Sequence, residues 1–335
     1  KFVHTVSAGY VTGAMFVLAI SAWYMLKGRD MAFARRSFAI ASAFGLAASL
    51  SVIVLGDESG YELGDVQKVK LAAVEAEWKT HPAPADFTLF GIPNEDTQTT
   101  DYALKIPGAM GLIATRSLDK EVAGLAELKE IHRQRIVNGQ TAYGLLKKLR
   151  AGEKTPENIA AFDAVKNDLG YGLLLMAYTD DPVNATAEQV EQAVQNSIPK
   201  VAPLFWSFRV MVAAGFIMLL VFALSFYHSA KRTPEKPRWL LKAALFSLPL
   251  PWIACEAGWF VAEYGRQPWA VGEILPTHLA ASQLSTTEIW ISLLAITALY
   301  TVFLIIEVWL MQHFARKGPA SIHTGKYHGE QAREV

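Results

Sequence analysis

The chain has 335 residues, of which 52% are hydrophobic and only 19% are charged, and its mean hydropathy is +0.22. Basic and acidic residues balance at 31 each. No basic stripe interleaved with aromatic residues occurs, so nucleic acid is not an expected partner. The single cysteine, Cys255, excludes a disulfide framework and a thiolate metal site.

Five apolar runs are long enough to cross a bilayer, for which a helix needs about 20 residues. Backbone groups in lipid must be hydrogen-bonded within their own segment, so these runs predict helices. The composition therefore predicts an all-α membrane protein, a transmembrane helix bundle with a large, mostly helical extracytoplasmic loop. The predicted spans are residues 2–26, 33–56, 202–228, 239–264 and 286–315.

Basic residues cluster on one side of these spans. They lie at 27–36, at 231–238 and at 316–317, and the positive-inside rule makes that side cytoplasmic. The long polar segment between the second and third spans then faces outward, on the periplasmic side. We expect four parts: two spans in 1–56, a periplasmic loop in 57–200, three spans in 201–315 and a cytoplasmic tail in 316–335.

The outward loop has its own structure. Apolar residues recur at helical spacing in Val66–Trp78, Leu125–Ile136 and Ala142–Leu149, between proline and glycine breaks. These patterns predict helices that fold over the membrane surface. The sequence opens on Lys-Phe-Val-His without an initiator methionine or a signal peptide, so we expect it to be a piece of a longer polypeptide.

Three residues in the first and third spans are candidate haem contacts. His4 offers an imidazole, which is a common ligand of haem iron, although a lone histidine near a helix end is more often an interface residue. Arg209 lies inside an apolar segment and needs an anionic partner, for which a haem propionate is one candidate. Met211 offers a thioether, the usual partner of histidine in electron-transfer haems, but methionine also fills core gaps.

The fourth span carries acidic and aromatic residues on one helical face. Trp252, Glu256, Trp259 and Glu263 follow the helical repeat, and such a face is not expected to point at lipid. Glu256 is either a metal ligand or structural glue paired with a base. Just outside the span, Arg266 is placed to hold carboxylates at the membrane boundary, unless it is a plain interfacial anchor.

In the outward loop, Lys70 and Glu75 lie on a predicted amphipathic helix. The simpler interpretation is a charged face in water. The functional interpretation is a quinol site, in which a carboxylate accepts protons from the hydroxyl groups and a cation stabilises the developing anion. The remaining histidines, His132 among them, are expected to be solvated.

Together these residues resemble subunit I of the cytochrome bd family of quinol oxidases. The resemblance rests on six stretches and extends over nearly the whole chain. The most specific stretch is Gly258 to Trp269, which includes Gly-Arg-Gln-Pro-Trp. The others are residues 3–12, 56–61, 70–78, 208–211 and 249–256.

The resemblance implies a role for each candidate. His4 and Met211 would be axial ligands of a low-spin haem b, with Arg209 as a charge close to it. Glu256 would ligate a high-spin haem b, Trp252 would lie between the haems and carry electron transfer, and Arg266 would contact propionates. Lys70 and Glu75 resemble residues implicated in quinol oxidation, and the long 57–200 segment resembles the long-loop branch of the family.

The family also implies haem d, reduction of O2 to water, a second large membrane subunit and possible small single-span subunits in a bacterial inner membrane. Subunit I normally has nine spans, and the four that precede His4 are absent from this sequence, with the haem d ligand and part of the proton path. Two alternatives remain open. One is an electron-transfer cytochrome b without an oxygen site, and the other is an ion or solute transporter.

Overall fold

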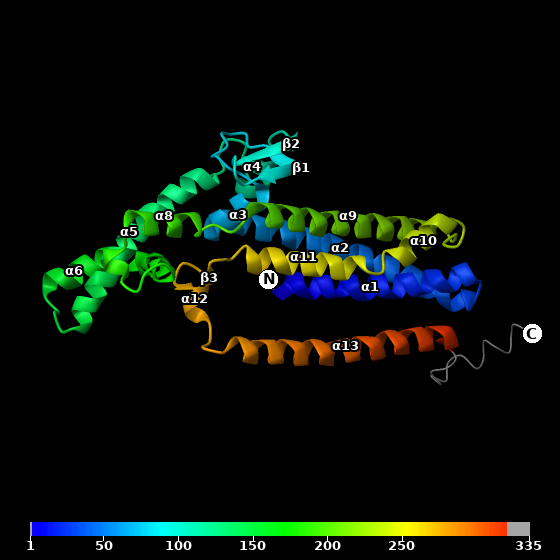
Figure 1. The fold of residues 1–335 in the computed structure, drawn as a ribbon. Helices are drawn as coiled ribbons and strands as arrows, with labels where there is room; N and C mark the ends of the chain where they lie inside the picture. The colour runs from blue at the N-terminus through cyan, green and yellow to red at the C-terminus, as the bar shows by residue number, and fades with distance from the viewer. Residues whose placement is uncertain (1, 320–335) are drawn as a thin grey trace, which may run out of the picture. The chain divides into compact units, whose positions relative to one another are not determined.

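The computed structural model describes residues 2–319 and is dominated by helices (Figure 1). Among those residues, five helical segments are long and apolar enough to cross a membrane, which confirms the predicted all-α membrane fold. Nearly all of the predicted tail at 316–335 lies outside the described residues. The five segments are α1 (Phe2–Lys27), α2 (Met31–Val66), α9 (Val201–Ala230), α10 (Arg238–Phe246) joined with α11 (Leu250–Tyr264), and α13 (Thr286–Lys317).

Two spans differ in detail from their prediction. Helix α2 continues to Val66 rather than ending at residue 56, because its polar last turns need no apolar surroundings to stay helical. The fourth span is two helices, since α10 ends at Phe246 and α11 begins at Leu250. Pro249 and Pro251 lie at this break, and proline cannot donate a backbone hydrogen bond within a helix.

The described chain forms two compact units, and each cuts across several helices. The second unit comprises Thr12–Ala47, Leu220–Leu248 and the chain from Ser282 onward. The first comprises the chain up to Val11, Ala48–Leu219 and Pro249–Ala281. This first unit contains every candidate site residue, namely His4, Lys70, Glu75, Arg209, Met211, Trp252, Glu256 and Arg266.

Close helix packing holds the second unit together. A Cβ atom on Gly45 of α2 would lie 2.2 Å from the Phe222 ring of α9, so only glycine fits at this crossing. The Tyr24 hydroxyl donates to the Ala315 carbonyl at 2.6 Å, and Arg29 donates to the Arg316 carbonyl at 3.0 Å. These two bonds attach the end of α13 to the end of α1 and satisfy carbonyls that a helix C-terminus leaves free.

The outward loop contains an antiparallel hairpin that the sequence analysis did not predict. Strand β1 (Phe87–Asn94) pairs with β2 (Thr99–Ile106). The Asn94 side chain accepts hydrogen bonds from the backbone N–H groups of Asp96 and Thr97, which is a turn geometry that asparagine favours. The threonine, tyrosine and isoleucine residues that follow this turn were the available strand signal.

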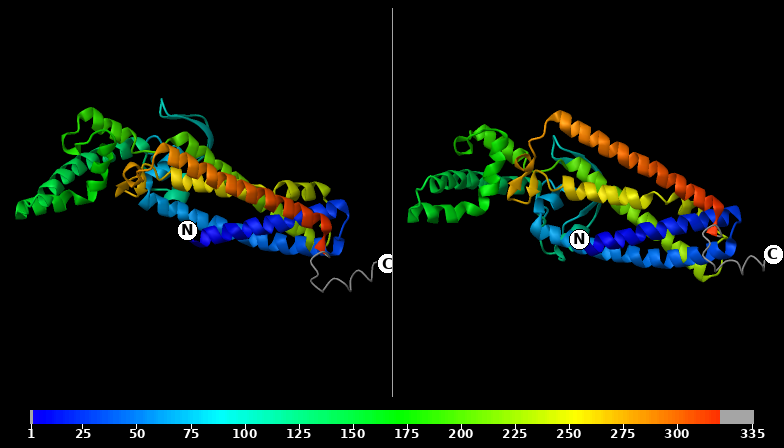
Figure 2. Two further views of the ribbon diagram at one scale, coloured as in Figure 1. Left: turned by 60° about the horizontal axis from the view of Figure 1, so that its bottom comes forward. Right: turned by 90° about the horizontal axis from the view of Figure 1, so that it is seen from below.

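Most of the rest of the loop is helical, as predicted, and Figure 2 shows the helices from residue 125 to residue 195 in green. The two predicted helices 125–136 and 142–149 form one helix, because Gly139 does not interrupt α5. Gly139 instead allows a close crossing with α7, since a Cβ there would lie 2.2 Å from the Gly172 nitrogen. The elements are α4 (Ala109–Thr115), α5 (Leu125–Arg150), α6 (Pro156–Val165), α7 (Leu169–Leu173) and α8 (Ala187–Gln195).

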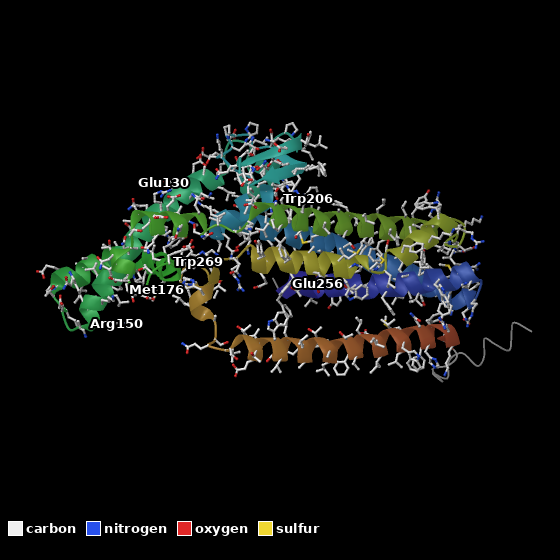
Figure 3. The ribbon with its side chains drawn as sticks, in the orientation of Figure 1. Glu130, Arg150, Met176, Trp206, Glu256 and Trp269 are labelled. Atoms are coloured by element: carbon white, nitrogen blue, oxygen red, sulfur yellow. The ribbon has the colours of Figure 1, made fainter. Side chains whose placement is uncertain are left out.

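A second outward segment, with strands β3 (Trp269–Val271) and β4 (Leu275–Pro276) and the short helix α12 (Thr277–Ala280), packs against α7. Figure 3 labels Trp269 where this segment meets the helices of the loop. The Trp269 ring lies 5.0 Å from the Tyr171 ring in an edge arrangement. A Cβ on Gly170 would lie 2.0 Å from the Glu273 carbonyl oxygen, so glycine is required at this contact.

His132 is buried at this contact, and the prediction that it is solvated is wrong. Its Nδ1 lies 2.8 Å from the Ser197 hydroxyl, and its Nε2 lies 3.2 Å from the Tyr171 hydroxyl. The Tyr171 hydroxyl donates to Glu273 at 3.1 Å, and Arg135 donates to the same carboxylate at 2.8 Å. This network joins α5, α7 and the 269–276 segment, which lie far apart in sequence, so periodicity within α5 could not reveal it.

The network predicts a loop that weakens in acid. Burial lowers the pKa of His132 to about 4, so between pH 6.5 and 4 the unfolded chain binds a proton that the folded chain does not. Folding stability is complete above pH 6.5 and falls by about 3 kcal/mol as the pH drops to 4. Thermal unfolding and protease resistance of the loop, measured at pH 7.5 and 5, should show this loss.

The variant His132→Asn should be less stable at pH 7.5 but should lack most of this acid sensitivity. The control Glu130→Gln, on the exposed side of the same helix, should keep it. An unchanged pH dependence in His132→Asn would show that another group causes the effect.

Candidate functional site

The short helix α3 (Lys68–Glu75) lies in the core of the first unit. All residues from Lys70 to Glu75 are buried, which overturns the simpler interpretation of a charged face in water. Small residues, Ala72 and Ala73 among them, allow the close approach. We call this cluster the α3 core, and its buried members are Ala72, Ala73, Val74, Ala76, Leu125, Leu128, Val201, Leu204, Phe205 and Val261.

Glu75 forms a buried ion pair with Arg209 of α9. The Arg209 Nη2 atom lies 2.7 Å from the Glu75 carboxylate, and both side chains are nearly inaccessible, with 11% and 5% exposed. Arg209 also donates to the Val74 carbonyl and to the Thr88 carbonyl of β1, each at 2.6 Å. The guanidinium lies over the Phe205 ring, 3.6 Å from its centroid. Arg209 therefore joins α9 to both α3 and the hairpin.

The anionic partner that an arginine in an apolar segment requires is thus Glu75 in this chain. Burial raises the pKa of the Glu75 carboxyl, and the Arg209 guanidinium opposes that shift. The Arg209 Nε atom is buried and has no hydrogen-bond partner among residues 2–319, so one donor of the guanidinium is unused there. This free donor is compatible with the expected position of Arg209 close to a haem.

Lys70 lies on the opposite part of α3 and contacts the end of α11. Its ammonium donates to the Ala262 carbonyl at 3.0 Å. A Cβ on Gly265 would lie 3.1 Å from two carbons of the Lys70 side chain and 2.5 Å from the Val261 carbonyl oxygen. Gly265 therefore leaves the space that the buried lysine stem occupies.

Arg266 follows directly and forms an ion pair with Glu263, which lies on the predicted acidic face of α11. Its Nε atom is buried and has no hydrogen-bond partner. Arg266 thus pairs with a protein carboxylate at the end of the span. The unused Nε donor is available to a further anion such as a propionate.

His4 and Met211 each place a possible ligand atom beside a glycine of a neighbouring helix. The His4 Nδ1 atom is buried and unpaired, and the ring lies against Gly56 of α2, where a Cβ would be 3.5 Å away. The Met211 sulfur lies above Gly258 of α11, where a Cβ would be 2.9 Å from it. Imidazole and thioether are the donor set of low-spin electron-transfer haems, so these residues fit that group.

The remaining face of α11 is open in this chain. Trp252 is 47% exposed and Trp259 64% exposed, and the Glu256 carboxylate has no hydrogen bond or ion pair with any residue of 2–319 (Figure 3). A carboxylate inside a membrane span is costly unless another group meets its charge. The face therefore carries an exposed carboxylate between two exposed indoles.

Sequence reasoning did not single out Glu77 as a site residue. Its side chain is only 7% exposed. Glu77 lies two residues after Glu75 in the sequence, and the two carboxylates interact electrostatically. The Thr88 carbonyl was also missed, because a backbone acceptor on an unpredicted strand has no side-chain signature. The signal for Glu77 was the run Glu75-Ala76-Glu77-Trp78, in which two acidic residues share one helix end.

The buried ion pair predicts a specific pattern of stability. Arg209→Gln leaves the Glu75 charge buried and unpaired, which costs about 3–5 kcal/mol. Glu75→Gln likewise leaves the Arg209 charge buried and unpaired. The double variant should recover much of the stability lost in either single variant, because no buried charge remains. Thermal unfolding of the four proteins in a double-mutant cycle measures this coupling. Additive losses would show that the two charges do not depend on each other.

Comparison with known proteins identifies the family of this chain. The family model described as "Cytochrome bd terminal oxidase subunit I" matches residues 1–319. The chain is 50% identical over 324 residues to the cytochrome bd-II ubiquinol oxidase subunit 1 of Escherichia coli, covering 97% of this chain and 63% of that protein. It is 25% identical to the cytochrome bd ubiquinol oxidase subunit 1 of Bacillus subtilis, covering 95% of this chain and 56% of that protein.

A solved structure supports the fold. The bd oxidase of Geobacillus thermodenitrificans superposes with a TM-score of 0.66 at 24% identity, over 94% of this chain and 57% of the solved chain. The chain thus spans roughly three fifths of the length of the relatives it matches, at 63%, 56% and 57%. The match over 1–319 shows that the chain belongs to the cytochrome bd terminal oxidase subunit I family.

Proposed function

We propose that this chain carries the quinol-oxidising site and two haem sites of a bd-type quinol oxidase in a bacterial inner membrane. The observation that carries the proposal is the burial of Lys70 and Glu75 against α11 and α9, the helices that bear Glu256 and Met211. A charged loop helix would normally remain in water. Its placement beside candidate haem ligands supports a site where quinol chemistry meets electron transfer.

His4 and Met211 would hold the iron of a low-spin haem b, and Arg209 would place its charge close to that haem. Glu256 would ligate a high-spin haem b, with Trp252 between the haems. Arg266 would contact propionates through its unused Nε donor. When bound, the haems supply electron transfer from quinol through the two b haems to haem d, where O2 is reduced to water.

Lys70 and Glu75 would have different roles toward the quinol, because their charges are opposite. The Glu75 carboxylate would accept a hydrogen bond and then the proton of a quinol hydroxyl, while the Lys70 ammonium would stabilise the anion that develops. Both groups are buried, and low local dielectric strengthens such interactions. Arg209 would keep the Glu75 side chain in one orientation through the 2.7 Å ion pair.

The position of the sites supports a proton-motive force without pumping. Met211 lies ten residues after the start of α9 and Glu256 eight before the end of α11, so each lies roughly 12–15 Å along its helix from the end that bears the loop. With the basic clusters in the cytoplasm, that end is periplasmic. Quinol would release protons there, and water formation would draw protons from the cytoplasm.

We also propose that the functional enzyme contains a second large membrane subunit and possibly small single-span subunits. The oxygen site would be completed by parts of the enzyme outside the described residues, and these would hold the haem d ligand. An absorption spectrum of the purified enzyme tests the whole assignment. A chlorin-type band beside the b bands supports the oxidase, b bands alone indicate an electron-transfer cytochrome, and no haem bands indicate a transporter.

The haem ligands predict separable spectral changes. In the assembled enzyme, Met211→Leu should alter only the low-spin haem b, because the thioether is one of its two axial donors. Glu256→Gln should lower the content of high-spin haem b and leave the low-spin bands intact. Difference spectra of the reduced and oxidised enzymes measure both effects.

Glu263→Gln is the matched control for Glu256, since both carboxylates lie on one face of α11 and Glu263 is already paired with Arg266. Loss of the high-spin haem in Glu263→Gln, with the haem retained in Glu256→Gln, would transfer the ligand role to Glu263. An unaltered low-spin spectrum in Met211→Leu would remove Met211 as a ligand.

Lys70 predicts a defect confined to quinol. Lys70→Met keeps the buried stem but removes the charge, so quinol turnover should fall about 100-fold, within the range for loss of one electrostatic stabiliser. Haem content and reduction by dithionite should stay normal. Oxygen consumption with quinol, compared with the haem spectrum of the same sample, measures this. A parallel loss of haem would make Lys70 structural instead.

A further inference from the structure

Glu77 is a buried acid that the proposed quinol chemistry leaves without a role. Its side chain is 7% exposed, yet its carboxylate forms no hydrogen bond or ion pair with the residues of 2–319. Buried carboxylates are normally paired, because removal of a charge from water is costly. An unpaired one next to a reaction that releases protons therefore needs an explanation.

The backbone holds Glu77 in place at the end of α3. Ala76 adopts a left-handed conformation with φ 54°, and the Glu77 N–H donates to the Ala72 carbonyl at 2.8 Å, as in a Schellman cap. The Glu77 carbonyl accepts from the Leu125 N–H of α5 at 2.8 Å. The chain thus reverses directly after Glu75 and fixes the second acid beside the first.

Five charged side chains from several segments of the chain interact with Glu77. Burial raises the pKa of Glu77 to about 7, which His81 and Lys105 oppose and the acids Glu75 and Asp86 reinforce. The Arg209 guanidinium of α9 also interacts with it electrostatically. A carboxyl that gains and loses its proton near neutral pH is suited to pass protons on.

Glu75 is poorly suited to retain a proton. Protonation of Glu75 would leave the buried Arg209 charge uncompensated, which the low-dielectric surroundings penalise. A proton taken from quinol must therefore move on before the next turnover. Glu77 lacks such a partner, so its protonation leaves no cation unpaired.

A route from Glu77 to the surface follows along the chain. The His81 imidazole lies 3.8 Å from the Asp86 carboxylate, and these two side chains are 23% and 30% exposed. Glu77 and His81 are also held against the same segment, since the Glu77 carbonyl accepts from Leu125 N–H at 2.8 Å and the His81 backbone pairs with Val122 at 2.9 and 3.1 Å. From inside to outside, the order is thus Glu75, which is paired, then Glu77, which is buried and unpaired, and then the partly exposed pair of His81 and Asp86.

We propose that Glu77 relays the protons of quinol oxidation from Glu75 to His81 and Asp86 at the surface of the loop. This inference rests on the proposed function. Each quinol loses two electrons to the haem iron of the enzyme and two protons to this route, one after the other. Glu77 accepts each proton as a carboxylate, becomes the neutral acid, and returns to the carboxylate when the proton passes through His81 to water.

The test is the pH profile of quinol oxidation by the assembled enzyme. Since only the carboxylate accepts protons, the wild-type rate should rise with pH through about 7. Glu77→Gln keeps the shape of the neutral acid, so it should fold with normal haem content. Its rate at pH 8 should fall roughly ten- to a hundredfold, and the rise should disappear.

Glu77→Asp should keep the rise with a shifted midpoint, and the exposed Glu121→Gln should match the wild type. His81→Asn, a second variant outside the core, should slow the rate at pH 8 and keep the haem spectrum. A wild-type pH profile in Glu77→Gln would overturn the relay. So would a loss of activity in Glu77→Gln that comes with loss of haem or of protease resistance, because Glu77 would then be structural. A wild-type enzyme without quinol oxidation would instead refute the proposed function itself.

Discussion

The buried ion pair between Glu75 and Arg209 is the constraint on which the rest of the site depends. Neither charge can be left alone in surroundings without water, so α3 must lie against α9 wherever the fold is complete. The Arg209 side chain is also held in one position, because it donates to the carbonyls of Val74 and Thr88 at the same time. The helix α3 is thereby attached to α9 at Arg209, two residues before Met211. The proposed quinol site thus lies against the helix that carries a proposed haem ligand.

This attachment requires small residues at particular points. The alanines of α3 let this helix pack closely against the other residues of the α3 core, and Gly265 leaves room for the stem of Lys70. Gly258 does the same for the sulfur of Met211. The side chains of Lys70 and Met211 can then pack closely against α11, and close packing restricts their orientation. The specificity of the Gly258 to Trp269 stretch thus has a physical basis in packing as well as in chemistry.

The segment between α2 and α9 is structured and is not a flexible tether. It is held at one end by the Arg209 bond to the hairpin and at the other by the network of His132, Tyr171 and Glu273. Both attachments use buried polar groups, which stabilise the fold only when each group has its hydrogen-bond partners. The loop can therefore position Lys70, Glu75 and Glu77 as firmly as a membrane helix would.

The sequence by itself determined the membrane class and the five spans, since span length and hydropathy are properties of local composition. It also indicated the family through motifs such as Gly265 to Trp269. Only the tertiary structure decided that Glu75 is the partner of Arg209, that His132 is buried, and that residues 87–106 form a hairpin. Each of these depends on segments far apart in the chain, and helical periodicity shows which residues share a face but not what another segment places against it.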